Sequence, residues 1–180
     1  MARIKQLNND EAQSYTKKLY RKIEESSGGV PNMFRCMGNS EMALDSFLSM
    51  NANLMAGKLG GKFIRMIMLS LSEVNGCEYC VAGQVQMAKN AGLLNEEECL
   101  NARRFMGSDD KSQAMLDFVK KVHETNGNVN DGDIQAVRDA GFGDAEIVEI
   151  LCTMALITFA NYIGNVGDPE LDFPEVVKIT

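Results

Sequence analysis

The stretch SEVNGCEYCVAGQ, Ser72 to Gln84, places two cysteines where one predicted helix ends and the next begins. Apolar spacing predicts a helix over Gly61–Asn75, and Gly76 can adopt the left-handed conformation that ends it. Cys77 and Cys80 then fall at the start of the following helix, which puts their Cα atoms about 5 Å apart, within disulfide range. A disulfide can therefore form between them with little movement of the backbone.

Outside this stretch the chain predicts an all-α, single-domain helical bundle of about seven or eight helices. Apolar residues recur at spacings of three and four, and no segment has the period of two that marks a strand. A Pro-containing connector is expected over Val30–Gly38. The expected helices cover Asp10–Ser26, Ser40–Ala56, Gly61–Asn75, Tyr79–Asn90, a segment opening at Asn95, Asp109–Thr125, Asp131–Ala140 and Asp144–Asn165.

An internal repeat predicts that two helical hairpins share one core. VQMAKNAG at Val85–Gly92 matches IQAVRDAG at Ile134–Gly141 in its apolar, amide, basic and Ala-Gly positions. A helix ending in Asn-Gly precedes each copy, at Asn75 and at Asn126. Chance is the alternative explanation, because Ala-Gly is a common helix stop. Only the first copy carries the cysteine pair.

Composition limits the partners and the location of the protein. The net charge of −7 comes from scattered acids without a basic stripe, which argues against nucleic acid and anionic membranes as partners. The longest mainly apolar run, Ile150–Ala160, is too short to cross a bilayer, and the first residues lack an apolar signal segment. Five irregularly spaced cysteines in a chain of this size indicate reduced thiols. We therefore expect a soluble, cytoplasmic protein in which any disulfide is transient.

The cysteine pair itself has three interpretations. Unpaired N–H groups at a helix start favour a thiolate, and a thiolate beside a resolving thiol can reduce a peroxide or exchange with a disulfide. A zinc site needs two more ligands, but the other cysteines are isolated and the single histidine is not in a ligand-spaced pair, so no metal is expected. The third interpretation is two buried cysteines that pack as small hydrophobes. Redox chemistry is the leading interpretation. The isolated cysteines are Cys36, Cys99 and Cys152, and the single histidine is His123.

The cysteine segment EVNGCEYCVAG, 73–83, resembles the core motif of the AhpD-like alkylhydroperoxidases, in the carboxymuconolactone decarboxylase family. GGVPNMFRCMGNS (28–40), AGFGDAEIVEI (140–150) and FANYIGNVG (159–167) resemble further parts of that family in the same order. The resemblance implies one AhpD-like domain over residues 1–180 with a core at about 28–167. It also implies a homo-oligomer, a trimer or a hexamer.

The same resemblance implies roles for the residues of the motif. The second cysteine of the family motif attacks the peroxide and the first captures it, so Cys80 would attack and Cys77 would resolve. Position at the helix start instead favours Cys77 as the more acidic thiol, and the order of the two stays open. The family's relay histidine is replaced by Gln84 and its glutamate by Arg65. Glutamine cannot shuttle a proton near neutral pH, so the relay is altered here.

Two nearby charges are candidates to replace that relay. Glu73, one turn before Cys77, is a candidate base, with an ordinary exposed acid as the alternative. Arg65 is a candidate to stabilise the thiolate or to pair with Glu73, with a surface cation as the alternative. Tyr79 and Asn161 are candidates for the substrate pocket.

These features together predict a thiol-dependent peroxidase of the alkylhydroperoxidase type, or a disulfide reductase, with an antioxidant role. Its substrate would be a hydroperoxide, and an external dithiol, a lipoyl group or a thioredoxin-like protein, would restore the cysteines. No organic cofactor is implied, because the cysteines carry the electrons. The alternatives are a carboxymuconolactone decarboxylase-type enzyme and a non-catalytic helical oligomer that kept the fold.

Overall fold

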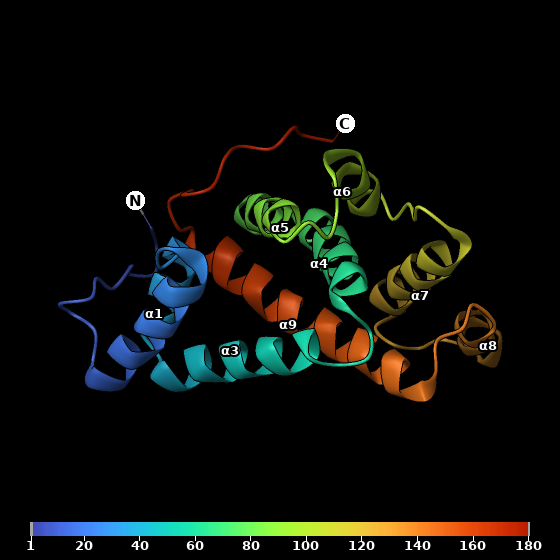
Figure 1. Cartoon of the computed structure of the whole chain (residues 1–180), viewed down its shortest axis with the longest axis horizontal. Helices are drawn as coiled ribbons and strands as arrows, with labels where there is room; N and C mark the ends of the chain where they lie inside the picture. The colour runs from blue at the N-terminus through green and yellow to red at the C-terminus, as the bar shows by residue number, and fades with distance from the viewer. Residues whose placement is uncertain (1, 180) are drawn as a thin grey trace.

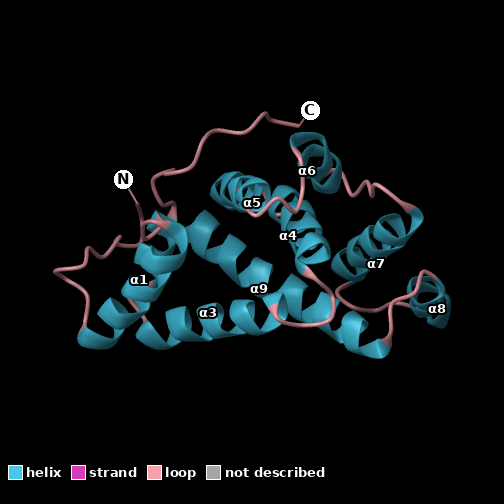
Figure 2. Ribbon diagram, viewed as in Figure 1, coloured by secondary structure: helices cyan, strands magenta, loops and turns pink. Residues whose placement is uncertain are grey.

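The computed structural model describes residues 2–179, and within that part the chain forms nine helices and no strand (Figures 1 and 2). The all-α prediction is confirmed. The helices are α1 Ser14–Ser27, α2 Asn32–Met37, α3 Glu41–Met55, α4 Gly61–Val74, α5 Glu78–Asn90, α6 Glu96–Arg103, α7 Asp110–Thr125, α8 Asp131–Asp139 and α9 Asp144–Gly167.

The additional helix is α2, in the segment expected to be a connector. Pro31 stands immediately before its first residue with φ −55°, and a proline restricted to this φ is compatible with a helix start. Four of the six residues of α2 are buried, so tertiary packing holds this short helix in place. The connector prediction for Val30–Gly38 was therefore wrong over most of its length.

Two helices, α4 and α9, form the centre of the bundle. Every residue from Ile64 to Ser72 in α4 is buried, as expected for a helix surrounded by others. Helix α9 packs against α2, α3, α4, α5 and α7, and in Figure 1 it runs between α3 on one side and α4 and α5 on the other. The cysteine pair lies at the junction of α4 and α5, directly on this centre.

Helix α9 extends well beyond the apolar run Ile150–Ala160, which by itself is too short to cross a bilayer. Its 24 residues include an 18-residue window of mean hydropathy 1.7, so by length and composition it could span a membrane. Buried core helices meet the same criteria, and half of that window is buried against other helices. Its outer side exposes apolar side chains: Val148, Leu151, Tyr162 and Val166.

The internal repeat is visible in the backbone. Gly92 and Gly141 both adopt positive φ, +63° and +88°, and end α5 and α8. The next residue donates its N–H back to an equivalent carbonyl in each copy, Leu93 to Ala88 at 3.0 Å and Phe142 to Val137 at 3.3 Å. The two Ala-Gly turns that the repeat aligns therefore end α5 and α8 in the same way.

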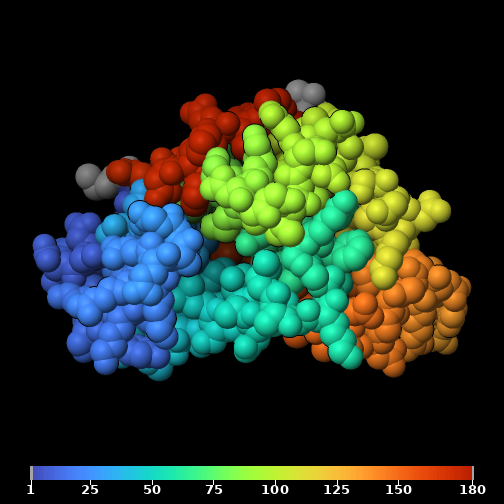
Figure 3. Space-filling view, viewed as in Figure 1, coloured from blue at the N-terminus to red at the C-terminus, as the bar shows by residue number. Residues whose placement is uncertain are grey.

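Residues 168–179, which follow α9, form no helix or strand. This C-terminal segment crosses α5 and ends near α6 (Figure 1), and its atoms lie directly against those helices in Figure 3. It is therefore part of the surroundings of the cysteine pair, although it follows Cys80 by about ninety residues in sequence.

Candidate active site

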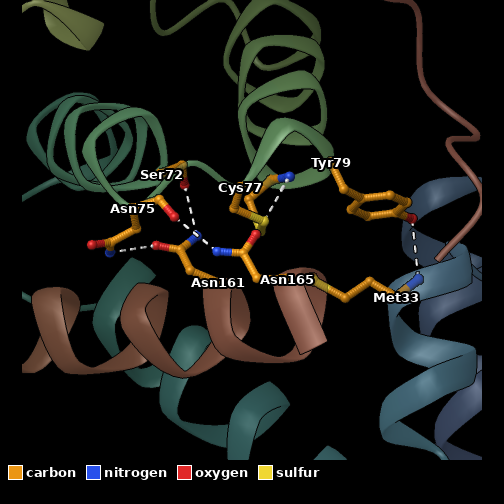
Figure 4. Close-up of a disulfide and its surroundings, with 8 residues drawn as sticks. Met33, Ser72, Asn75, Cys77, Tyr79, Asn161 and Asn165 are labelled. Atoms are coloured by element: carbon orange, nitrogen blue, oxygen red, sulfur yellow. Dashed lines mark hydrogen bonds between the residues drawn. A yellow bond between two sulfur atoms is a disulfide. The ribbon is translucent and has the colours of Figure 1, made fainter. Parts of the chain in front are cut away.

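Cys77 and Cys80 form a disulfide at the start of α5 (Figure 4). Cys77 is the N-cap of the helix, and its sulfur accepts a hydrogen bond from the Cys80 N–H at 3.3 Å. The Cα atoms are 5.2 Å apart, which confirms the predicted spacing. The two residues are only 1% and 3% exposed, so the pair is enclosed by protein.

A glycine of α9 provides the surface on which this disulfide rests. A Cβ atom built on Gly164 would lie 2.5 Å from the Cys77 Sγ and 3.2 Å from the Cys80 Sγ. Real Cβ atoms essentially never approach another atom to 2.5 Å, and 3.2 Å is tighter than most Cβ contacts. Only glycine therefore allows α9 to lie this close to the oxidised pair.

Asn161 lies beside the pair, and both ends of its side-chain amide are bonded to protein groups (Figure 4). Its Nδ2 donates to the Ser72 Oγ at 3.1 Å, and its Oδ1 accepts from the Asn75 Nδ2 at 2.9 Å. Asn165 adds a bond from its Nδ2 to the Asn75 carbonyl at 2.8 Å. Fully buried, Asn161 joins the end of α4 to α9 beside the disulfide.

Tyr79, between the two cysteines, points away from them toward α2 and the C-terminal segment. Its hydroxyl donates to the Asp172 Oδ1 at 2.5 Å and accepts from the Met33 N–H at 3.1 Å. Its ring meets Phe173 edge-on, with centroids 5.4 Å apart. Burial, and then the bond to Asp172, raise the pKa of Tyr79, so the phenol stays protonated.

The two positions at which the family relay is altered contact each other. The Arg65 Nη1 on α4 donates to the Gln84 Oε1 on α5 at 2.6 Å. The same nitrogen lies 3.8 Å from the Met68 Sδ and 3.6 Å from the Met87 Sδ, while the Arg65 Nε has no partner among the described residues. Arg65 is buried, which lowers its pKa, so the surface-cation interpretation is wrong.

Glu73 pairs with a different arginine from the one that the sequence suggested. The Arg103 Nε of α6 donates to the Glu73 Oε2 at 2.7 Å, and the Arg103 Nη2 donates to the Val177 carbonyl at 2.8 Å. Arg65 therefore does not pair with Glu73. The side chain of Arg103 is only 5% exposed, although no motif in the sequence singled it out.

A cavity of 510 Å³ borders this ion pair and the first cysteine. Glu73, Cys77 and Arg103 line its inner side, and Val176 and Lys178 line its outer side. A smaller cavity of 200 Å³ continues past Arg103 to Cys99. The candidate base Glu73 and Cys77 thus border one space, whose outer wall is the C-terminal segment. Cys80, Gln84, Arg65, Tyr79 and Asn161 line neither cavity.

The remaining cysteines lie apart from this cluster. Burial raises the pKa of Cys36 and of Cys99, which keeps these thiols protonated. The Cys36 Sγ donates to the Ile4 carbonyl at 3.3 Å. Within residues 2–179 no three His, Cys, Asp or Glu side chains gather in a way that could hold a metal ion.

Comparison with known proteins agrees with this geometry. The sequence profile of the carboxymuconolactone decarboxylase family matches residues 43–121, which include α4, α5 and the cysteine pair. No curated protein sequence matches the chain.

Three solved structures show the likeness of the fold. A peroxidase-related protein with an alkylhydroperoxidase AhpD core, from Ralstonia eutropha JMP134, has a TM-score of 0.84 and 21% identity over 95% of this chain and 92% of its own. A putative antioxidant defence protein AhpD from Agrobacterium tumefaciens has a TM-score of 0.65 and 25% identity over 76% of this chain and 94% of its own. The debrominase Bmp8, bound to 2,3,4-tribromopyrrole, has a TM-score of 0.75 and 17% identity over 94% and 91%.

The profile match contains the cysteine pair, and the likeness of fold extends over nearly the whole chain. The chain therefore has the AhpD-like fold, and its residues 43–121 carry the sequence pattern of the carboxymuconolactone decarboxylase family.

Proposed function

We propose that this protein is a thiol-dependent peroxidase in which Cys77 and Cys80 are the redox pair. The observation that carries the proposal is the disulfide at the start of α5, within an AhpD-like fold. Unpaired N–H groups at the first turn of α5 favour a thiolate at either cysteine. An antioxidant role follows from that chemistry.

The reaction balances with the two thiols and one external dithiol. The Cys80 thiolate attacks a hydroperoxide oxygen, the O–O bond breaks, and the departing alkoxide takes up a proton to become an alcohol. The sulfenic acid on Cys80 then reacts with the Cys77 thiol, so that an S–S bond forms and water leaves. A lipoyl group or a thioredoxin-like protein reduces the disulfide and supplies the two electrons.

Glu73 is the proposed proton acceptor in place of the family histidine. Its carboxylate borders the same cavity as Cys77, and Arg103 fixes its position. A carboxylate can accept a proton, whereas the Gln84 amide cannot near neutral pH. Arg65, which Gln84 links to the helix of the cysteines, adds a buried positive charge that favours a thiolate.

The protein is further proposed to act as a cytoplasmic homo-oligomer, a trimer or a hexamer. The exposed apolar side chains on the outer side of α9, together with Met42 of α3, offer a surface for contact between copies. Sedimentation of the purified protein tests this, and a monomer at all concentrations would exclude it.

Peroxide-dependent loss of thiols tests the proposed activity. The reduced protein is exposed to hydrogen peroxide or cumene hydroperoxide, and its free thiols are counted and located by alkylation and mass spectrometry. We expect Cys77 and Cys80 to be lost together, and Cys80→Ser to abolish peroxide consumption. Cys99→Ser, a buried cysteine outside the pair, is the matched control and should match the parent.

Other results of this assay would favour the alternatives. A pair that stays reduced in excess hydroperoxide would refute the peroxidase. Conversion of a carboxymuconolactone by the same protein would then identify a decarboxylase, and its absence would leave a helical oligomer without turnover. Regeneration by dihydrolipoamide or by thioredoxin separates the two classes of reductant.

A further inference from the structure

The C-terminal residues Leu171–Ile179, here called the strap, form the outer wall of the 510 Å³ cavity. Leu171, Val176 and Ile179 of the strap line the cavity opposite Cys77 and Glu73. Figure 3 shows the C-terminal atoms lying directly against those of α5 and α6. An external molecule that approaches the cysteine pair from this side meets the strap first.

The first anchor of the strap is the carboxylate of Asp172. Its Oδ1 accepts the Tyr79 hydroxyl at 2.5 Å, and its Oδ2 accepts the Asn32 N–H at 2.8 Å. These bonds reach two helices, α5 and α2, and a charged acceptor makes each of them stronger than a neutral bond. Tyr79, which sits between the cysteines, therefore holds the strap rather than contributing to a cavity wall.

The second anchor is the ring of Phe173, which packs against a glycine inside α5. A Cβ atom on Gly83 would lie 3.1 Å from the ring, which is tighter than an ordinary contact. Glycine within a helix costs about 1 kcal/mol relative to alanine. At Gly83 this cost is offset by the close approach of Phe173, which also contacts Tyr79 edge-on.

The third anchor joins the strap to the candidate base. Arg103 donates to the Val177 carbonyl and, through a different nitrogen, to the Glu73 carboxylate. Lys178 adds an ion pair with Glu78 at 2.9 Å, but both side chains are largely exposed and contribute little. Movement of the strap thus changes the surroundings of Glu73 as well as the access to the cavity.

We propose that the strap is a gate over the redox pair, and that it is released before an external dithiol reduces the disulfide. The strap has no helix or strand of its own and is held by a few side-chain anchors, so it can detach without opening the helical core. Both cysteines are buried while it is docked. This inference rests on the proposed function for its choice of a dithiol as the incoming molecule.

The test weakens the contact between Phe173 and Gly83 in the full-length protein, once by a substitution in α5 and once by a substitution in the strap. Gly83→Ala places a methyl group against the Phe173 ring and leaves the strap sequence intact, while alanine favours the α5 helix and so preserves folding. Phe173→Ala removes the ring from the strap side. Gly167→Ala, where a Cβ would make ordinary contacts of 3.5 Å or more with Ile4, is the matched control.

The rate of disulfide reduction by dithiothreitol is the main readout. Loss of one aromatic contact corresponds to about a threefold to tenfold change, so we expect reduction to accelerate by this factor in either variant. The double variant should be no faster than the single ones, because both remove the same contact. Hydrogen exchange over residues 171–179 should rise in parallel, and Gly167→Ala should match the parent.

Parent-like reduction rates in variants whose strap exchanges faster would overturn the gate. So would a double variant whose acceleration is the product of the two single effects. The readout needs no peroxide turnover, so the gate can be confirmed in a protein that consumes no hydroperoxide. Equally, unchanged reduction rates in a protein that does consume hydroperoxide would refute the gate alone.

Discussion

Replacing Gly164 by alanine should shift the redox equilibrium of the pair toward the dithiol. In the oxidised protein the added Cβ would lie 2.5 Å from the Cys77 Sγ and 3.2 Å from the Cys80 Sγ. The disulfide ties each sulfur to the other, so neither can move aside alone. After reduction, each thiol can rotate about its own Cα–Cβ bond and make room for the methyl group.

The size of the shift follows from the cost of overpacking in one state only. An extra methyl group in a well-packed site costs about 1–3 kcal/mol. The gain in helix propensity from glycine to alanine is the same in both redox states and cancels from the comparison. Because 30 mV corresponds to about 1.4 kcal/mol for a two-electron couple, the reduction potential of Gly164→Ala should rise by about 20–65 mV.

Equilibration with dithiothreitol buffers, followed by acid quenching and mass spectrometry, measures that potential. Gly167→Ala on the same helix is the control, since its Cβ would meet only Ile4 at ordinary distances. A potential in Gly164→Ala that equals that of the control, or lies below that of the parent, would refute the argument that α9 discriminates between the two redox states.

Three further predictions concern the residues around the pair and one surface cap. Arg65→Glu combined with Gln84→His should accelerate thiol oxidation by peroxide on the order of 10²-fold by supplying a proton relay, as followed by stopped-flow fluorescence; an unchanged rate would contradict this. Asn161→Ala should lower the free energy of unfolding by about 1–3 kcal/mol, because it removes hydrogen bonds to the buried Ser72 hydroxyl and the half-buried Asn75 amide; urea titration checks this, and a loss below about 0.5 kcal/mol would not fit. Lys62, followed by a backbone N–H of the α6 cap, holds the pKa of Glu98 below its ordinary 4.5. Glu98→Gln should therefore cost about 1 kcal/mol at pH 7, a difference that is present above pH 4.5 and disappears as the pH falls through the lowered pKa; curves that stay parallel in acid would refute it.

The helices were predictable where their start and stop signals are local. The predicted Gly61–Asn75 and Asp109–Thr125 differ from α4 and α7 by one residue at one end, because glycine and aspartate caps act within a single turn. Helix α2 was missed because a proline in a sequence usually indicates the end of a helix. So short a helix is stabilised mainly by the burial of its side chains, which the sequence does not show.

The candidate site likewise has one part that local sequence predicts and one part that depends on tertiary packing. The spacing of Cys77 and Cys80 is set by one turn of helix, so the sequence alone placed their Cα atoms correctly. Arg103, Gly164 and Asp172 come from segments far along the chain, and no local pattern marks an arginine, a glycine or an aspartate as part of this site. They could be recognised only after the packing of α6, α9 and the strap was known.

Arg65 and Gln84 show why a residue can be predicted to matter while its environment is not. The resemblance identified both positions because they depart from the family pattern, and it implied that two side chains there exchange a proton. In this chain a guanidinium donates to an amide oxygen instead, at 2.6 Å, and no carboxylate among residues 2–179 forms an ion pair with it. Burying a charge costs free energy unless the charge is paired or hydrogen-bonded, and here the Gln84 oxygen accepts the hydrogen bond of Arg65. Gln84 lies one turn after Cys80 on α5. A permanent positive charge can favour a thiolate at every physiological pH, whereas an imidazole would do so only when protonated. On the proposed function, the altered pair would therefore supply electrostatic support in place of proton transfer, and the carboxylate of Glu73 would accept the proton.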